Sequence, residues 1–322
     1  MADPFPFRDI PLNAVDLEDH AFVVPGGDLT RLLSSLQEVG LLNPPCLRAR
    51  PDERWQVVTG LKRLRAAAEL GWQSLPARTL PTATPESHCL LVALYDNAFT
   101  RGFHLWEQAI LARRLLDYWD RATVAARFLP YLGLPPSAAH LDRLLKVSTL
   151  EPPFQELCAR GRLALTTAST LAQWPAADRA AAFPYLSDLP LSQSKQEQFL
   201  EDVEILARRD GVSAGEILCR QPLTQLLHDP KLNPKVRAEA VRQLLRRWVN
   251  PRLSAALAAF QEALGRLGLK GHSRIQLQPP PAFEGPDFHL EIKFADAREL
   301  KNLLEEIARL TAQEEFAALT RL

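Results

Sequence analysis

The stretch Val57–Ala68, VVTGLKRLRAAA, decides the fold of the first part of this chain. It reads as the apolar end of a strand, one glycine, and a helix that opens with Lys62, Arg63 and Arg65. A glycine lets backbone amides approach an anion closely, and the first turn of a helix leaves N–H groups unpaired and partly positive. Arginine binds phosphate oxygens in pairs. The pattern predicts a phosphate-binding turn, with a solvated basic helix face as the alternative.

Segments on either side predict a small α/β domain around this turn. The apolar patterns favour strands over residues 10–15, 46–50, 55–59 and 75–80, with helices over residues 28–39 and 61–70. The sequence PTATP at residues 81–85 marks a break, and residues 87–95 then favour a helix.

Two further blocks accompany the turn. Upstream, LLSSLQEVGLLNPP at residues 32–45 predicts an amphipathic helix that stops at Gly40. Downstream, residues 96–109 read DNAFTRGFHLWEQA. The order of the three blocks resembles the N-terminal domain of the ParB family, the partition proteins that bind CTP and clamp DNA.

The family's blocks contain Gly-Leu-Leu-x-Pro after a Ser-containing helix, then Gly-Glu-Arg-Arg-x-Arg-Ala, then Glu-Asn-x-x-Arg followed by Glu. The positions that match here are Ser35, Gly40, Pro44, Gly60, Arg63, Arg65, Ala66, Asn97, Arg101 and Glu107. The resemblance implies a nucleotide site that binds CTP through Gly60, Lys62, Arg63, Arg65, Asn97 and Arg101. It also implies a Mg²⁺ ion near Asp96 and Asn97, since hard oxygen ligands and phosphates suit magnesium.

Three departures from the family pattern concern the chemistry of this site. Leu61 stands where the family has Glu, and Thr100 stands where it has Gln, a residue type that can orient an attacking water. The family's Gln-Pro-Arg block is replaced by DHAFVVP at residues 19–25. Weak CTP hydrolysis therefore stays open, as does the choice of nucleotide.

Composition limits the kinds of partner. The chain has 322 residues, 47% of them hydrophobic, which suits two or three domains with real cores. Its net charge is zero, so any contact with DNA must be local. The four cysteines are scattered without metal or redox spacing, which favours free thiols in a reducing cytoplasm. We find no run long enough to span a bilayer and expect no membrane partner.

Residues 122–147 favour a helix-turn-helix, with GLPP at residues 133–136 as the turn. The DNA-binding candidates on its second helix are Ser137, His140, Arg143 and Lys146. The resemblance to the ParB family continues through residues 150–165. Because the start of the second helix has few cations, a helical domain without base readout is the alternative.

Residues 231–252 form a basic segment with seven Lys or Arg residues against the single acid Glu239, a local charge of +6. Arg242 and Arg246 are its candidates for contact with DNA phosphates. Pairing with acidic surfaces of the protein is an equal alternative.

The last part of the chain predicts two strands and a helix. Residues 274–278 and 288–294 alternate at period two around a proline-rich loop at 279–287, and residues 298–310 keep their apolar positions on one stripe. This order resembles the ParB family's C-terminal dimerisation domain and implies a homodimer. The loop lacks the lysines that the family often places there, so we expect no DNA bridging through it. A hairpin that packs on its own chain is the alternative.

Together these patterns predict an α+β multidomain protein. The expected parts are a ParB-N-like α/β domain over residues 1–100, an all-α helix-turn-helix domain over 101–210, a basic helical connector over 211–265 and a ββα dimerisation domain over 266–322. The resemblance implies a cytoplasmic, nucleoid-associated, CTP-dependent dimeric clamp on DNA with a centromere-like site and a partition ATPase as partners. The alternatives are a metal-dependent phosphotransfer enzyme or nuclease of the same superfamily, using Asp96 and Glu107, and an adaptor that binds no nucleotide.

Overall fold

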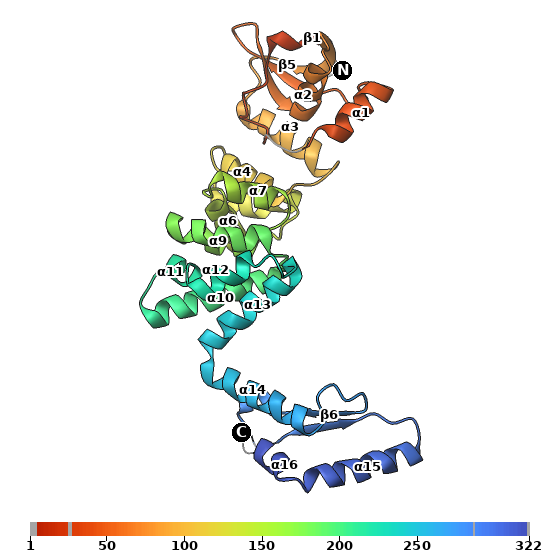
Figure 1. Ribbon diagram of the computed structural model, residues 1–322. Coiled ribbons are helices and arrows are strands. Elements are labelled where there is room, and N and C mark those ends of the chain that lie inside the picture. The colour runs from red at the N-terminus through yellow and green to blue at the C-terminus, as the bar shows by residue number, and fades with distance from the viewer. Residues whose placement is uncertain (1–4, 25–27, 286, 321–322) are drawn as a thin grey trace. The chain divides into compact units, whose positions relative to one another are not determined.

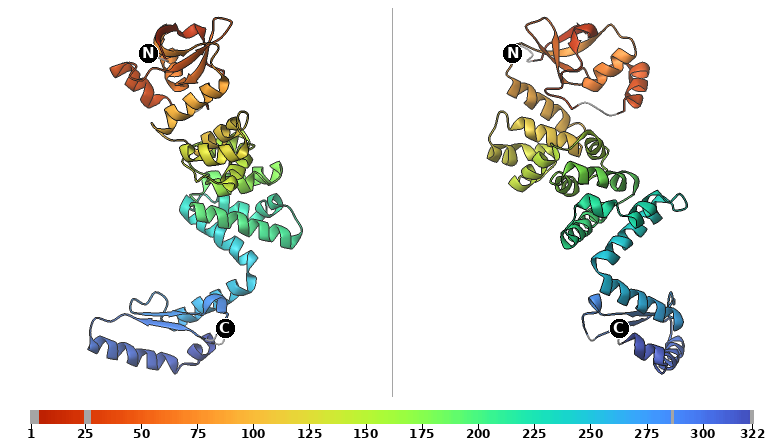
Figure 2. Two further views of the ribbon diagram at one scale, coloured as in Figure 1. Left: turned by 180° about the vertical axis from the view of Figure 1, so that it is seen from behind. Right: turned by 60° about the vertical axis from the view of Figure 1, so that its left-hand side comes forward.

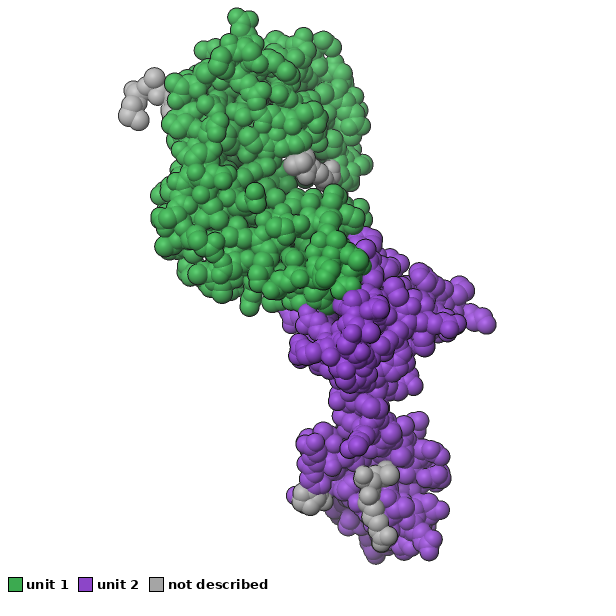
Figure 3. All heavy atoms as spheres, turned by 90° about the vertical axis from the view of Figure 1, so that its left-hand side faces the viewer, with its two compact units in different colours: residues 1–179 green, residues 180–322 purple. Residues whose placement is uncertain are grey.

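The computed structural model describes residues 5–24, 28–285 and 287–320, and the chain divides into two compact units, residues 1–179 and 180–322 (Figure 3). Pro25 of the divergent N-terminal block, Pro286 of the proline-rich loop and the extreme ends of the first and last expected domains lie outside the described residues. The finer division into four domains stays a prediction.

A mixed five-stranded sheet begins unit 1 (Figure 1). Its strands are β1 (Phe7–Pro11), β2 (Val15–Asp16), β3 (Cys46–Ala49), β4 (Trp55–Thr59) and β5 (Ser74–Leu80), in the order β1-β5-β3-β4-β2. The β1–β5 and β3–β4 pairs are antiparallel, whereas β3–β5 and β2–β4 are parallel. The strands expected over residues 46–50, 55–59 and 75–80 are therefore present.

The single strand expected over residues 10–15 is wrong. The chain leaves β1 at Pro11, makes a 3-10 turn over Leu12–Ala14, and enters β2 at the opposite edge of the sheet. Proline has no N–H to continue a strand ladder, and the next residue, Leu12, donates its N–H to the carbonyl of Gln73 at 2.9 Å. Hydrophobic alternation alone does not reveal this crossing.

Helices cover the sheet on both faces. They are α1 (Thr30–Val39), α2 (Leu61–Glu69) and α3 (Glu86–Ala98). Leu61 and Leu64 of α2 pack against Val57, Leu47 and Ile10 in one buried cluster. Val58 points to the other face because side chains alternate along a strand, and there β4 contacts α3. Each fully buried Leu or Val contributes about 1.5–3 kcal/mol. The sheet therefore holds α2 and α3 in fixed positions near the end of β4.

The rest of unit 1 is helical. Its helices are α4 (Leu105–Leu115), α5 (Arg121–Thr123), η2 (Val124–Phe128), η3 (Leu129–Leu132), α6 (Ala138–Val147), α7 (Pro152–Ala159) and α8 (Leu165–Leu171). The first helix of the expected helix-turn-helix is irregular, with a π-helical segment in η2 and a 3-10 turn in η3. Pro130 in η3 cannot donate a helical hydrogen bond, which favours the irregularity. The second helix forms where the sequence predicts it.

Unit 2 begins with a group of helices. They are α9 (Ala176–Asp188), which starts in unit 1, α10 (Gln193–Asp210), α11 (Ala214–Leu218), α12 (Gln221–His228), α13 (Pro234–Val249) and α14 (Pro251–Arg266). The basic segment falls mainly on α13. Among the described residues, no helix is both long and apolar enough to cross a membrane.

The end of unit 2 contains the predicted hairpin and helix. Strands β6 (Ile275–Gln278) and β7 (His289–Ile292) pair antiparallel, η4 (Pro281–Phe283) lies in their loop, and α15 (Ala297–Thr311) and α16 (Glu314–Leu319) follow. All views show α15 running beside the hairpin (Figure 1, Figure 2). Ile275 and Leu277 pack with Phe260 of α14 and Leu303 of α15. The hairpin thus packs on its own chain, while dimerisation stays a prediction.

Candidate functional site

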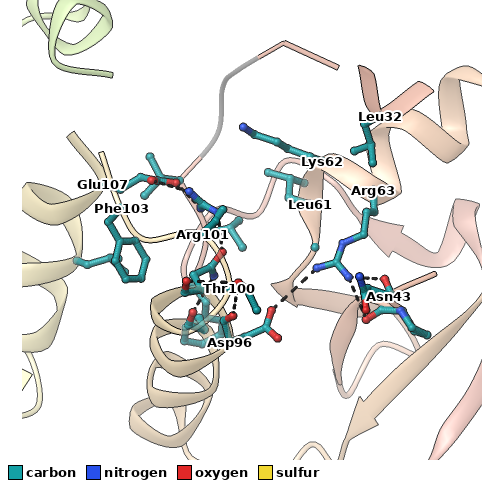
Figure 4. A pocket seen from close by; sticks show the side chains of 18 of the residues that line it. Leu32, Asn43, Leu61, Lys62, Arg63, Asp96, Thr100, Arg101, Phe103 and Glu107 are labelled. Carbon is teal, nitrogen blue, oxygen red and sulfur yellow. Dashed lines mark hydrogen bonds and ion pairs between the residues drawn. The ribbon is translucent and has the colours of Figure 1, made fainter. Parts of the chain in front are cut away.

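A pocket of about 370 Å³ lies in unit 1 where the start of α2 faces α3 and the first turn of α4 (Figure 4). Six residues named from the sequence line it: Gly60, Lys62, Arg63, Asp96, Asn97 and Arg101. The second and third sequence blocks therefore meet in space. Pockets of this size, about 300–1,000 Å³, are typical of small-ligand sites.

Gly60 forms the turn between β4 and α2. Its φ of +87° is left-handed, a region that L side chains rarely adopt. A Cβ atom built at Gly60 would lie 2.7 Å from Cβ of Pro45, so the turn has no space for a side chain. No side chain caps α2, and the N–H of Arg63 donates to the carbonyl of Gly60 at 2.9 Å. The N–H groups of Leu61 and Lys62, two residues that line the pocket, are left without a helical partner. This is the arrangement that binds anions at a helix N-terminus.

Arg63 extends from α2 across the pocket toward α3 (Figure 4). Its Nη1 donates to the backbone carbonyl of Asn43, and its Nη2 lies 4.0 Å from a carboxylate oxygen of Asp96. Burial lowers the pKa of Arg63, and the charge of Asp96 acts in the opposite direction. A guanidinium has five N–H donors, so these contacts leave donors for a ligand.

Lys62 and Arg65 differ in where they point. Lys62 is exposed and lines the pocket, and its ammonium group makes no hydrogen bond or ion pair with the described residues. Arg65 does not line the pocket. Its Nη2 donates to the backbone carbonyl of Leu17 at 3.2 Å and lies 3.3 Å from the carboxylate of Glu18. Arg65 therefore ties α2 to the segment after β2, away from the other cations of the turn.

The third block forms a closed polar network between α3 and α4. Arg101 binds both carboxylate oxygens of Glu107, at 2.9 and 2.6 Å, and its Nε donates to Oδ1 of Asn97 at 2.9 Å. Glu107 also caps α4 together with His104. Burial acts to raise the pKa of Glu107, but hydrogen bonds and charge from Arg101 outweigh it and hold the pKa below its usual value. Asn97 and Arg101 thus join two helices at the pocket wall.

The metal candidates offer one free carboxylate. The amide of Asn97 donates to the carbonyl of Ala93 at 2.8 Å, and its oxygen already accepts from Arg101. Asp96 faces the pocket with no hydrogen bond to its carboxylate among the described residues. Within the same residues no three His, Cys, Asp or Glu side chains gather around a metal position. The arrangement fits Mg²⁺ only as an ion held by phosphates plus Asp96.

Two of the departures from the family pattern, Leu61 and Thr100, line the pocket. Leu61 is 5% exposed and packs in the sheet core at the wall of the pocket. The Thr100 hydroxyl donates to the backbone carbonyl of Asp96 at 2.6 Å. Neither side chain can activate a water molecule. The pocket therefore has no side chain at positions 61 and 100 that can act as a general base.

Further pocket residues were not among the site candidates named from the sequence. Phe22, Val23 and Val24, from the DHAFVVP block that departs from the family pattern, line the pocket, and Arg114 of α4 donates to the carbonyl of Val23 at 3.1 Å. Arg78, on β5, lines it as well. The described lining holds four cations, Lys62, Arg63, Arg78 and Arg101, against the carboxylates of Asp96 and Glu107, a net charge of +2. The pocket thus favours an anionic ligand.

The DNA-binding candidates of unit 1 lie along α6. Ser137 is the residue before the helix, and Lys146 near its end donates to the side chain of Gln173 at 3.0 Å. Arg143 is half-buried, and Nδ1 of His140 is buried with no hydrogen-bond partner among the described residues. Near the start of α6 the exposed charged residue is an acid, Asp142, which forms an ion pair with Arg121.

The basic segment of unit 2 is partly occupied by contacts within the unit. Arg242 is 11% exposed, pairs with Glu239 at 2.8 Å, and donates to Gln198 of α10 at 3.1 Å. Arg246 also donates to the Gln198 side chain. These two guanidinium groups join α13 to α10 through a neutral side chain, so the alternative of pairing with acidic surfaces also stays a prediction. Their contact with DNA stays a prediction.

Solved structures with similar chains include the C-terminally truncated chromosome-partitioning protein ParB from Caulobacter crescentus. Its complex with the centromeric parS site is 18% identical, covers 59% of this chain and 96% of that chain, and has a TM-score of 0.34. Its complex with CTP-gamma-S is 22% identical, covers 56% of this chain and 99% of that chain, and has a TM-score of 0.25.

Curated relatives match over about a quarter of this chain. The probable plasmid-partitioning protein ParB of Thermus thermophilus is 36% identical over 89 residues, which is 28% of this chain and 29% of that protein. The nucleoid occlusion protein of Bacillus cereus is 27% identical over 89 residues, 28% and 30% of the two chains. The matches therefore span less than a third of these relatives. A sequence model of the ParB N-terminal domain matches residues 24–98, and this region of the chain belongs to the ParB N-terminal domain family.

Proposed function

We propose that the pocket of unit 1 binds a nucleotide through its phosphates, and that CTP is this nucleotide. The observation that carries the proposal is the meeting of Gly60, Lys62 and Arg63 with Asp96 of α3 in one pocket. The open N–H groups of α2 supply hydrogen bonds, and the side-chain cations supply charge. CTP is the nucleotide implied by the resemblance of the three sequence blocks to the ParB family.

Magnesium would enter this site with the phosphates. Asp96 is the carboxylate that would hold it, because its oxygens face the pocket and carry no hydrogen bond from the described residues. The ion would reduce repulsion between phosphate groups and Asp96. Asn97 would contribute by holding Arg101 in place, since both ends of its amide are already bonded.

Calorimetric titration of CTP in the presence of Mg²⁺, with ATP and GTP for comparison, tests the binding. We expect Arg63→Ala to lose CTP affinity by about tenfold or more, because a charged hydrogen bond contributes about 1.5–3 kcal/mol. Arg65→Ala is the matched comparison on the same helix, and we expect it to keep CTP affinity because its guanidinium binds the segment after β2. No heat from any nucleotide with the wild-type protein would overturn the proposal and favour the adaptor alternative.

We further propose that the whole chain is a partition-type, DNA-associated dimer in which nucleotide binding controls closure of the N-terminal parts. A ligand drives closure only if it binds the closed state more tightly, so phosphate contacts of Arg63 would have to be stronger there. The hairpin and α15 would supply a permanent dimer contact. Leu290 of β7, Phe294 in the connection to α15 and Leu304 of α15 support this, because they are 38%, 50% and 50% exposed.

Distance measurements between spin labels test the closure. A label at Leu42→Cys, in a Cys219→Ser background, reports on the N-terminal part, because Leu42 is 71% exposed. We expect CTP to produce a new short distance between the two labels of a dimer, and Arg63→Ala to abolish it. A label at Lys301→Cys on α15 should give the same distance between the two chains of the dimer with and without CTP. An N-terminal distance that ignores CTP in a protein that binds it would contradict closure.

A further inference from the structure

Arg78 lies on β5, between β1 and β3 of the N-terminal sheet. It pairs with Phe7 of β1 on one side and with Cys46 of β3 on the other, and its N–H donates to the carbonyl of Pro45 at 2.9 Å. Pro45 is also the residue that packs against Gly60. The backbone of Arg78 is therefore tied directly to the turn that opens α2. Its side chain lines the pocket.

The guanidinium of Arg78 has no acidic partner among the described residues. Arg48 and Arg50, on and just after β3, each reach a carboxylate, Glu86 at 3.7 Å and Asp16 at 3.1 Å. Arg78 instead lies over the ring of Phe7, 5.6 Å from the ring centre, and its charge acts on the neighbouring Arg63. Two arginines that face one pocket repel each other unless an anion lies between them. The carboxylate of Asp96 offsets this repulsion beside Arg63, whereas no carboxylate of the described residues pairs with Arg78. An anionic ligand would offset the repulsion for Arg78.

Phe7 is placed as a support for this arginine. Its ring is 56% exposed on the edge strand β1, so core packing does not account for it. An aromatic face attracts a guanidinium and orients its planar fork, which reduces the freedom that Arg78 must lose when it binds. Phe7 itself does not line the pocket. It is a positioning residue that acts through Arg78.

We propose that Arg78 is an additional phosphate-binding residue of the pocket, oriented by Phe7, and that it selects nucleotides that carry a chain of phosphates over nucleoside monophosphates. This rests on the proposed nucleotide function of the same pocket. Arg78 lies outside the three sequence blocks and adds a second guanidinium beside Arg63. Without Arg78 the net charge of the described lining falls from +2 to +1.

Titrations of CMP, CDP and CTP with Mg²⁺ into Arg78→Ala test the assignment. We expect CTP affinity to fall by about tenfold or more, CDP affinity to fall less, and CMP affinity to stay the same, because only longer phosphate chains reach a second guanidinium. Arg78→Lys keeps the charge without the fork and should recover part of the CTP affinity. Arg8→Ala is the control, since it removes an exposed cation from β1, directly after Phe7 and outside the pocket lining.

The role of Phe7 is tested by a double-mutant comparison. Phe7→Leu should lower CTP affinity roughly twofold to fivefold in the wild type, the range of an exposed cation–π contact, and should have no effect in the Arg78→Ala background. Equal losses in both backgrounds would overturn the positioning role. Unchanged CTP affinity in a folded Arg78→Ala protein, while Arg63→Ala still abolishes binding, would overturn the assignment of Arg78 but leave the nucleotide site intact. A wild-type protein that binds no nucleotide would overturn both.

Discussion

At the scale of single residues, Gly60 is under two separate constraints. Its left-handed φ favours glycine, and Pro45 excludes a side chain. Gly71, just after α2, also has a left-handed φ, of +76°, but a Cβ atom there would meet no atom within 4 Å. A comparison of substitutions at the two glycines therefore distinguishes the cost of backbone strain from the cost of side-chain crowding.

We predict that Gly60→Ala destabilises the protein more than Gly71→Ala does. Both substitutions place alanine in the left-handed region, at a cost of about 1–2 kcal/mol. Only Gly60→Ala must also move Pro45 and the start of α2, so only this variant should lose nucleotide affinity. Urea denaturation measures the first effect and CTP titration the second. Equal stability of the two variants would contradict the crowding argument.

A second residue-scale prediction concerns pH. The folded pKa of Glu107 lies below its ordinary value of 4.5, so the Arg101–Glu107 pair stabilises fully above pH 4.5 and is lost as pH falls through the lower folded value. Glu107→Gln should cost about 1–2 kcal/mol at pH 7 and should flatten the acid side of the stability profile. The exposed pair of Glu156 and Arg160 gives the control, because Glu156→Gln should leave that profile unchanged. Parallel profiles for wild type and Glu107→Gln would contradict the assignment.

At the scale of elements, α15 presents two faces through adjacent leucines. Leu303 is 7% exposed and packs against the hairpin and α14, whereas Leu304 is 50% exposed. The same helix thus holds the end of unit 2 together and offers an apolar surface outward. A partner chain on that surface is the arrangement that the proposed dimer requires.

We predict opposite effects for alanine at these two positions. Leu303→Ala should lower the free energy of unfolding by about 2–5 kcal/mol, because it opens a cavity in the core. Leu304→Ala should change the stability of the monomer little but weaken self-association. Thermal denaturation and sedimentation analysis at several concentrations measure the two effects. A dimer that Leu304→Ala leaves unchanged would place the contact elsewhere.

At the scale of the whole molecule, the net charge of zero makes any DNA binding depend on a few local cations. The side chain of Arg242 is only 11% exposed, whereas Lys146 of α6 is exposed, and its contact with Gln173 uses one of three ammonium N–H donors. A phosphate contact by one lysine contributes about 0.9 to the slope of log affinity against log salt. The salt dependence therefore counts the contacts directly.

We predict that Lys146→Ala reduces this slope by about 0.9 on duplex DNA. Lys301→Ala removes one exposed cation from α15 and should leave the slope unchanged. Fluorescence anisotropy across a range of salt concentrations measures both. An unchanged slope for Lys146→Ala would remove α6 from the DNA interface and favour a helical domain without base or phosphate contact.

The sequence by itself determined the local elements of the site and most of the fold. Glycine between an apolar strand and a basic helix is a local signal, and it predicted Gly60, Lys62 and Arg63 at the pocket. The same signal did not distinguish Arg65, which lies outside the pocket lining, from Arg63. The two side chains point in different directions because two positions along a helix turn the side chain by about 200°. Residues 10–15 misled for a similar reason, since the alternation continues through Pro11 although the chain crosses the sheet there.

Only the tertiary structure decided which distant residues share the pocket. Arg78 is a single cation in a short strand, and nothing near it in sequence marks it as functional. Arg78 lies near Arg63 because β5 pairs with β3, and Pro45, the residue before β3, packs against Gly60. Likewise, only packing decided that Arg242 and Arg246 bind α10, because charge in a sequence does not tell which partner lies opposite. Local signals depend on neighbouring residues along the chain, whereas the composition of a site depends on strand pairing and helix packing between segments far apart in sequence.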